Sequence, residues 1–284
     1  MSSRRNQDRV GAPNPDTSPH PALATTEKDS IFSFVVPTEF VELPSGGEFY
    51  PESHPLCGKT TLEIRHMTAK EEDILTSESL LRRGVAIDRL LQSLILDRSV
   101  IVHDLLIGDK NALIIAARIT GFGEKFTTKV RCTSCKETQD TDFDLGKLTI
   151  RNPEIPDNVE QSEENTFFVK LPLSGITVEL RLMTGRHEQQ YINSSQKRKK
   201  KKMQETTSTD LLKLLVISAD GHDDVVSINK FISILPLRDS LYIKDTYEKI
   251  SPDVDLTQDF ECETCGHEGG VGVPLNADFF WPQR

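Results

Sequence analysis

The sequence lacks several features that mark common protein classes. It has no run of 18 or more apolar residues, so no membrane-spanning helix is expected. The motifs Gly-x-Ser-x-Gly, His-Glu-x-x-His and Gly-x-x-x-x-Gly-Lys-[Ser/Thr] are all missing, so no familiar catalytic or phosphate-binding site is expected. The N-terminus has basic residues with no apolar segment behind them, which argues against a secretory signal. These absences favour a non-enzymatic protein made in a reducing compartment.

Positive charge and aromatic side chains are also scarce. The chain has 34 Lys and Arg against 44 Asp and Glu, a net charge of −10 at pH 7, and only 6% aromatic residues. Nucleic acids are bound by neutralising phosphates with Lys and Arg and by stacking bases on aromatic rings. The composition therefore argues against nucleic acid as a partner.

Cysteines are few, but their spacing is informative. Four of the five form two Cys-x-x-Cys pairs, Cys132 with Cys135 and Cys262 with Cys265. An odd count without a secretory signal argues against a disulfide framework. Two residues between cysteines is the spacing of a zinc knuckle, and two knuckles supply the closed four-thiolate site of structural zinc. We therefore predict one structural Zn²⁺ held by these four cysteines, with the nearby His267 outside the ligand set.

Other roles for the cysteine pairs remain open. Each pair could be a redox dithiol of a Cys-dependent oxidoreductase, although neither sits in a thioredoxin-like strand-to-helix setting. They could also be buried free thiols, although polar residues surround them. A four-thiolate zinc site leaves no open position for a substrate. The sequence therefore predicts no catalytic and no cofactor-binding residues besides the metal ligands.

Two stretches of the chain look like copies of each other. Residues Leu62–Leu75 and Val178–Ile192 each read as an alternating strand that ends in Arg-x-Met-Thr and leads into a charged helix start. In the first stretch, Thr68 and Glu71 have the spacing of a helix capping box. In the second stretch His187 takes the position of the glutamate, so no capping box is expected there.

Further features repeat in the same order. Phe40–Pro44 resembles Phe167–Pro172 in type, Asp88–Ile95 resembles Asp210–Ile217, and each series ends in one cysteine pair. We interpret this order as one duplication of a unit of roughly 115 to 130 residues, much longer than a solenoid repeat. The predicted fold class is α+β, with two pseudo-symmetric repeats of strands and helices joined by a shared, zinc-ribbon-like site of four cysteines.

Composition suggests the domain boundaries. Residues 1–30 are rich in Pro, Ser, Thr, Asn and Asp and are expected to form a flexible tail. Residues 31–150 form the first repeat with the first knuckle, and residues 151–165 read as a linker. Residues 166–284 form the second repeat with the second knuckle and an aromatic C-terminal tail. This tail could fold back onto the core or dock into a neighbouring protein.

Six consecutive cations, Lys197–Lys202, interrupt the second repeat. Their mutual repulsion predicts an extended, solvated loop. The loop could be a mobile surface segment, or it could contact an acidic protein or a nucleic acid.

Several short blocks resemble the baseplate hub proteins of T-even-type contractile-tailed phages. In the first half these blocks are Leu43–Tyr50, Met67–Thr76, Asp88–Leu91, Asp104–Asn111 and Ala116–Gly121, and in the second half they are Arg181–Thr184 and the cysteine pair. The resemblance implies a structural or assembly role, with other phage tail and baseplate proteins as partners and a possible oligomer within the assembly. It places the protein in the tail baseplate of the virion, or in the host cytoplasm during assembly.

One alternative function belongs to a different class. A zinc-ribbon nucleic-acid-binding regulator would account for the knuckles, for the neighbouring Arg131 and Lys136, and for the run Lys197–Lys202. The net negative charge and the few aromatic residues count against it.

Overall fold

The computed structural model describes residues 36–200, 207–275 and 277–280. The predicted flexible tail, residues 1–30, lies outside this part of the chain. The first half contains the elements β1 (Thr38–Glu42), β2 (Thr61–Arg65), α1 (Ala69–Thr76), α2 (Glu78–Arg83), α3 (Ala86–Leu94), η1 (Val102–Asp104), α4 (Ile107–Phe122), β3 (Lys125–Arg131), β4 (Thr138–Asp144), η2 (Leu145–Lys147) and β5 (Thr149–Arg151). The second half contains β6 (Val159–Gln161), β7 (Thr166–Lys170), β8 (Thr177–Arg181), α5 (Gly185–Lys200), α6 (Thr207–Leu215), β9 (Val216–Ala219), α7 (Val225–Ile234), α8 (Leu237–Ile250), β10 (Asp253–Asp255), β11 (Thr257–Glu261), β12 (Glu268–Gly272) and η3 (Ala277–Phe280).

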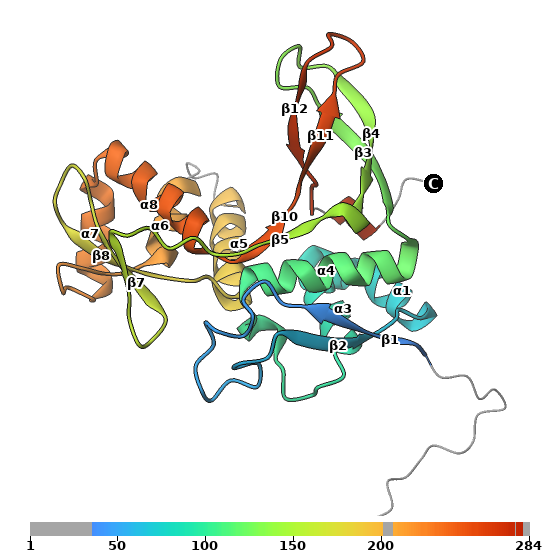
Figure 1. Cartoon of the computed structure of the whole chain (residues 1–284), viewed down its shortest axis with the longest axis horizontal. Helices are drawn as coiled ribbons and strands as arrows, with labels where there is room; N and C mark the ends of the chain where they lie inside the picture. Colours follow the sequence, from blue (N-terminus) through green and yellow to red (C-terminus); the bar gives the residue numbers. More distant parts are fainter. Residues whose placement is uncertain (1–35, 201–206, 276, 281–284) are drawn as a thin grey trace, which may run out of the picture. The chain divides into compact units, whose positions relative to one another are not determined.

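The α+β class is confirmed, and every described strand pair is antiparallel (Figure 1). The strands β1 and β2 form a two-stranded sheet, and β6, β7, β8 and β9 form a four-stranded one. The hairpins β3–β4 and β11–β12 rise from the helical part, and β5 pairs with β10 at their base. The strand β6 lies within the predicted linker 151–165, and it pairs with β7 of the second half.

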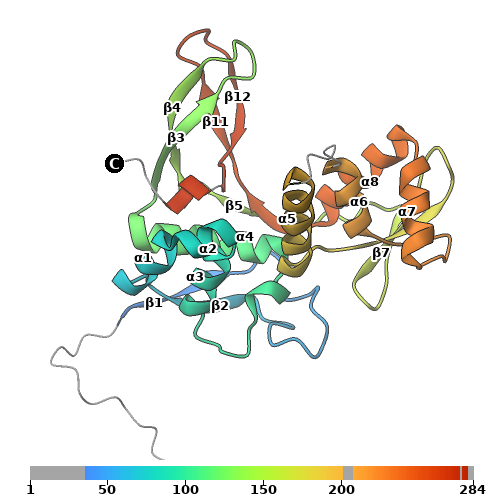
Figure 2. The same ribbon diagram turned by 180° about the vertical axis from the view of Figure 1, so that it is seen from behind.

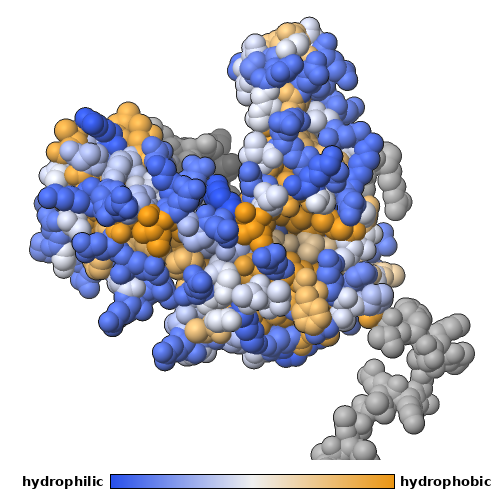
Figure 3. All heavy atoms as spheres, in the orientation of Figure 1, coloured by the Kyte–Doolittle hydropathy of each residue, from blue (hydrophilic) through white to orange (hydrophobic). Residues whose placement is uncertain are grey.

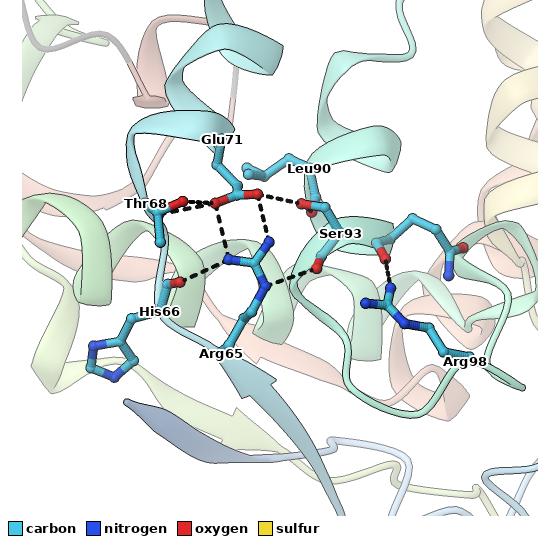
Figure 4. A network of polar contacts seen from close by, with 8 residues as sticks. Arg65, His66, Thr68, Glu71, Leu90, Ser93 and Arg98 are labelled. Carbon is cyan, nitrogen blue, oxygen red and sulfur yellow. Dashed lines mark hydrogen bonds and ion pairs between the residues drawn. The ribbon is translucent and has the colours of Figure 1, made fainter. Parts of the chain in front are cut away.

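The first strand-to-helix junction is held by an ion pair (Figure 4). An Arg65 guanidinium nitrogen lies 2.6 Å from a carboxylate oxygen of Glu71, and Glu71 also accepts hydrogen bonds from the amide and hydroxyl of Thr68 at 3.0 and 2.7 Å. Burial by itself would raise the pKa of Glu71, but the bonds to Arg65 and Thr68 outweigh it and hold this pKa at about 2. The capping box predicted from Thr68 and Glu71 is confirmed.

The second junction is capped by a different chemical group. The Thr184 amide donates to His187 Nδ1 at 3.1 Å, and the Thr184 hydroxyl lies 3.2 Å from the same nitrogen. A neutral imidazole nitrogen is a hydrogen-bond acceptor, and burial, with a smaller contribution from Arg181, lowers the pKa of His187 and keeps it neutral. A histidine thus caps this helix in place of the glutamate of a capping box, an interaction that the sequence analysis did not foresee.

The predicted solvated loop at Lys197–Lys202 is also corrected. The helix α5 continues through Lys200, while Lys201 and Lys202 lie outside the described residues. Lys, Arg and Gln have long unbranched side chains with good helix propensity. An ion pair between Arg198 and Asp210 also joins α5 to α6, and this attraction offsets part of the repulsion between the neighbouring cations.

The C-terminal aromatic residues fold back onto their own chain. Phe279 and Phe280 are buried, and Arg118 donates from Nε to the Phe279 carbonyl at 2.9 Å. The Arg118 guanidinium also lies 4.9 Å from the ring centre of Phe122. Of the two predicted fates of the tail, folding back holds for these two phenylalanines, and residues 281–284 lie outside the described part.

The two halves meet where a junction of one contacts a helix start of the other. The Ile107 amide donates to the Met183 carbonyl at 3.0 Å, and the Gly185 amide donates to the Leu105 carbonyl at 2.9 Å. Figures 1 and 2 both place α5 between α4 and α6. From Val36 onward the chain forms one compact unit, because its hydrophobic core draws buried residues from both halves.

Lys110 adds a buried charge contact to this junction. Its ammonium group lies 2.6 Å from Asp88 in the first half and 2.6 Å from Glu188 in the second. Burial lowers the pKa of Lys110, but the two carboxylates outweigh it and raise the pKa. The ammonium therefore stays charged while it links α4 to α5.

Candidate metal centre

Each cysteine pair sits in the turn of a β-hairpin. The pair Cys132 and Cys135 follows β3, and the pair Cys262 and Cys265 follows β11 (Figure 1). The alternating strands place the first cysteine of each pair inward, so Cys132 and Cys262 are buried. Cys135 is half-buried and Cys265 is exposed.

The two turns share the same backbone hydrogen bonds. The Cys132 amide donates to the carbonyl of Glu137 at 2.8 Å, and the Cys262 amide donates to the carbonyl of His267 at 2.9 Å. In each turn the residue after the second cysteine has a positive φ, 66° for Lys136 and 63° for Gly266. Such a turn directs both sulfurs of a pair and several backbone N–H groups toward one point, as a zinc knuckle requires.

All four sulfurs converge. They lie within 4.8 Å of one another, with 3.8 Å between the sulfurs of Cys132 and Cys265 and 3.6 Å between those of Cys135 and Cys262. A tetrahedron with zinc–sulfur bonds of 2.3 Å has edges of about 3.8 Å. The spacing therefore fits a tetrahedral zinc ion, and the four residues predicted as ligands are brought together. The identity of the metal stays a prediction.

The surroundings favour a thiolate at the cluster. The N–H groups of Cys135 and Ser134 point at the Cys132 sulfur and lower the pKa of Cys132 to about 6. The N–H of Glu137 lowers the pKa of Cys135, but burial and the other three thiols together raise it to about 12. Four sulfurs this close cannot all ionise unless a cation compensates their charge, which is the chemistry of a metal site.

Two glutamines dock the hairpins side by side, and the sequence analysis missed both. Gln139 of β4 donates to the Glu261 carbonyl and accepts from the Glu263 amide, both at 2.9 Å. Gln258 of β11 donates to the Asp144 carbonyl at 2.6 Å and accepts from the Asp144 amide at 3.0 Å. Both glutamines occur in a Thr-Gln-Asp tripeptide, which is the sequence signal that could have revealed them.

The other residues considered as ligands, His267 and Cys57, lie outside the sulfur cluster. His267 Nε2 lies 3.0 Å from the Thr133 hydroxyl, so this side chain contacts the opposite turn. Cys57 is an exposed free cysteine in the loop before β2. Within the described residues, the group that could hold a metal consists of the four predicted cysteines.

Among the described helices, none is long and apolar enough to cross a membrane. The fold and the cluster together define a mixed α+β protein in which two distant hairpins build a potential four-cysteine metal site.

The family of T4 bacteriophage base plate proteins matches residues 36–281, and the chain belongs to this family. Membership gives the protein a structural place in the phage baseplate, with other phage tail proteins as partners and the virion tail as its location. The resemblance read from the short sequence blocks is thereby confirmed at the level of the family. No curated protein and no solved structure matches the chain.

Proposed function

We propose that this protein is a subunit of the baseplate hub at the tip of a contractile tail, where it acts through protein–protein contacts. One Zn²⁺ ion, bound by Cys132, Cys135, Cys262 and Cys265, stabilises it. The observation that carries the proposal is the match of residues 36–281 to the baseplate family, combined with four sulfurs at tetrahedral spacing. The assignment to the hub is further supported by the blocks between Leu43 and Gly121, which resemble baseplate hub proteins.

Zinc would act as a clamp between distant parts of the chain. Cys135 and Cys262 are 127 residues apart. Closing a loop of this length in the unfolded chain is entropically costly, so an ion that bridges its ends contributes free energy of folding. The Gln139 bonds between the hairpins are exposed and those of Gln258 are half-buried, and the ion would add a further link at the hairpin turns.

The role has no catalytic step. The buried carboxylates of the described residues have structural partners: Glu71 caps a helix, and Asp109 and Asp239 accept backbone N–H groups. A closed set of four cysteines leaves zinc no position for a substrate. The regulator alternative loses support, because the family is one of baseplate proteins and the net charge is −10.

We also propose that the two halves are pseudo-symmetric repeats. The support is a set of contacts found once in each half, at matching positions. The Ser45 amide donates to Asp109 at 2.9 Å and the Leu173 amide donates to Asp239 at 2.9 Å. The same correspondence relates the two helix caps and the two cysteine turns.

Elemental analysis of the purified protein tests the metal. One zinc per chain is expected in the wild type, and its loss is expected in Cys132→Ser and in Cys262→Ser, each with a lower unfolding temperature. Cys57→Ser is the matched control, because Cys57 is exposed and away from the cluster. Two zinc ions per chain, or none, would refute the shared site.

The hub role is tested in phage particles. A phage with a stop codon in this gene is complemented by plasmid-borne copies, and purified baseplates are examined by quantitative mass spectrometry. We expect the wild-type chain in a fixed ratio to other baseplate proteins, or baseplates that stall without it. Normal baseplates in its absence would contradict the proposal.

A further inference from the structure

Large aliphatic side chains are exposed where α7 meets α8. Ile234 and Leu237 flank the short connection between the helices and are 74% and 73% exposed. Leu241 lies one turn further along α8, and the Leu173 amide donates to Asp239 in the first turn of α8, so the Leu173 backbone lies at the start of this helix while its side chain is exposed. We call Leu173, Ile234, Leu237 and Leu241 the α7–α8 patch; orange spheres gather over this region in Figure 3. Clustered exposed aliphatics mark an interaction surface, whereas single ones are common.

The corresponding segment of the first half is covered. The start of α4 corresponds to the start of α8, because Asp109 and Asp239 are each the third residue of their helix. The two residues before α4, Leu105 and Leu106, therefore correspond to Leu235 and Pro236 before α8. Leu105 and Leu106 are buried, because the junction Met183–Gly185 of the second half lies on them. Leu237 of the α7–α8 patch corresponds to Ile107, whose amide donates to the Met183 carbonyl, so the patch includes the counterpart of a residue that already has a partner inside the chain.

The first half has a junction that corresponds to Met183–Gly185, and this junction has no such partner among the described residues. Met67–Ala69 leads from β2 into α1 as Met183–Gly185 leads from β8 into α5. In both junctions the threonine amide donates to the side chain three residues further on, Glu71 in the first and His187 in the second. The Met183 carbonyl and Gly185 amide bond to the first half. Within the described part of the chain, the Met67 carbonyl and the Ala69 amide have no such bond, and Ala69 is exposed.

We propose that the α7–α8 patch of one chain binds the Met67–Ala69 junction of a second copy of this chain. The contact repeats between chains the one that joins the two halves within a chain, and it rests on the pseudo-symmetry proposed above. Patch and junction are different surfaces, so the association is head-to-tail. Such contacts give a ring where the rotation closes and a helical array where it does not.

The contact between copies is looser than the one within the chain. At Gly185 a Cβ atom would lie only 3.1 Å from the Val102 carbonyl oxygen, and the counterpart of Gly185 is Ala69, which carries such an atom. The backbones therefore approach less closely between copies than within one chain. Arg238 and the first-turn acid Glu72 are both exposed, one on each surface, and have opposite charges. We expect reversible, concentration-dependent association that added salt weakens.

Sedimentation velocity of the full chain with its bound zinc tests the proposal at concentrations up to about 0.2 mM, where even weak contacts with micromolar dissociation constants are populated. The weight-average mass is expected to rise with concentration in the wild type. Leu237→Asp disables the patch and Ala69→Arg disables the junction, and each should weaken association at least tenfold. Ile155→Asp is the control, because Ile155 is an exposed aliphatic residue outside both surfaces.

Mixing the two variants decides the geometry. Leu237→Asp keeps its junction and Ala69→Arg keeps its patch, so together they should form a one-to-one dimer that does not grow. A wild type that stays monomeric throughout, or variants that fail to pair when mixed, would overturn the proposal. Zinc content and circular dichroism are measured on the same samples. A monomeric chain with one zinc would overturn this inference alone, whereas a chain without zinc would overturn the proposed clamp.

Discussion

Asp109 and Asp239 make the same contact in the two halves of the molecule. Each is fully buried in the first turn of a helix, and each accepts the amide of the residue that follows a Leu-Pro pair, at 2.9 Å. A carboxylate in this place satisfies a buried amide and interacts favourably with the positive end of the helix dipole. It therefore fixes the end of a strand against the start of a helix in each half.

Removing the first of these carboxylates is expected to be costly. Asp109 also accepts from the hydroxyls of Ser45 and Tyr50, at 2.6 and 2.7 Å. Asp109→Ala leaves these buried donors unpaired and should lower the free energy of unfolding by about 3 kcal/mol. Urea unfolding measures this, with Asp109→Asn as a variant that keeps one acceptor and should lose less. Equal stability of Asp109→Ala and wild type would show that the carboxylate is dispensable.

The Arg65–Glu71 pair predicts a pH dependence of stability. The pKa of Glu71 is lowered in the folded protein from 4.5 to about 2, so its carboxylate stabilises the fold above pH 4.5. This contribution, on the order of 2–3 kcal/mol, is lost as the pH falls from 4.5 toward 2. Urea midpoints at several pH values should drop less steeply in Glu71→Gln than in wild type. Glu72→Gln, at the exposed neighbour, should follow the wild type; an identical slope in Glu71→Gln would contradict the assignment.

The second junction predicts a stabilising substitution. Arg181 corresponds to Arg65, and its buried Nε has no hydrogen-bond partner among the described residues. His187→Glu would provide a carboxylate at the position that Glu71 has in the first half, and it should raise the free energy of unfolding by about 1 kcal/mol. Thermal unfolding at pH 7 checks this. The reverse change Glu71→His should destabilise, and Gln190→Glu controls for an added charge at an exposed position of the same helix. A destabilised His187→Glu would argue against the correspondence of the two junctions.

The glutamine contacts predict an effect on metal affinity. Gln139 and Gln258 hold the hairpins together before the sulfurs meet an ion, so the double change to Ala should weaken zinc binding at least tenfold. Competition with a chromophoric chelator measures the dissociation constant. Asp140→Asn, next to Gln139 but exposed, should leave it unchanged. Affinity unaffected by the double substitution would mean that the cysteine turns alone organise the cluster.

The sequence by itself determined the features that depend on near neighbours. The two Cys-x-x-Cys turns, the strands that lead to them and the cap formed by Thr68 and Glu71 follow from residues within a few positions of each other. The sequence order also indicated that the two cysteine pairs meet, since each closes a similar series of elements. These local patterns were enough to predict the α+β class and the four residues of the cluster.

Tertiary structure decided what depends on burial and on distant partners. Burial lowers the pKa of His187 and so favours the neutral imidazole that caps its helix, and the helix α5 continues into the lysine run where Arg198 meets Asp210. Some contacts join residues more than 100 positions apart: Gln139 donates to the Glu261 carbonyl of β11, and Arg118 donates to the Phe279 carbonyl. Such contacts have no signature at short range, because their energies arise only when the folded chain removes both partners from water.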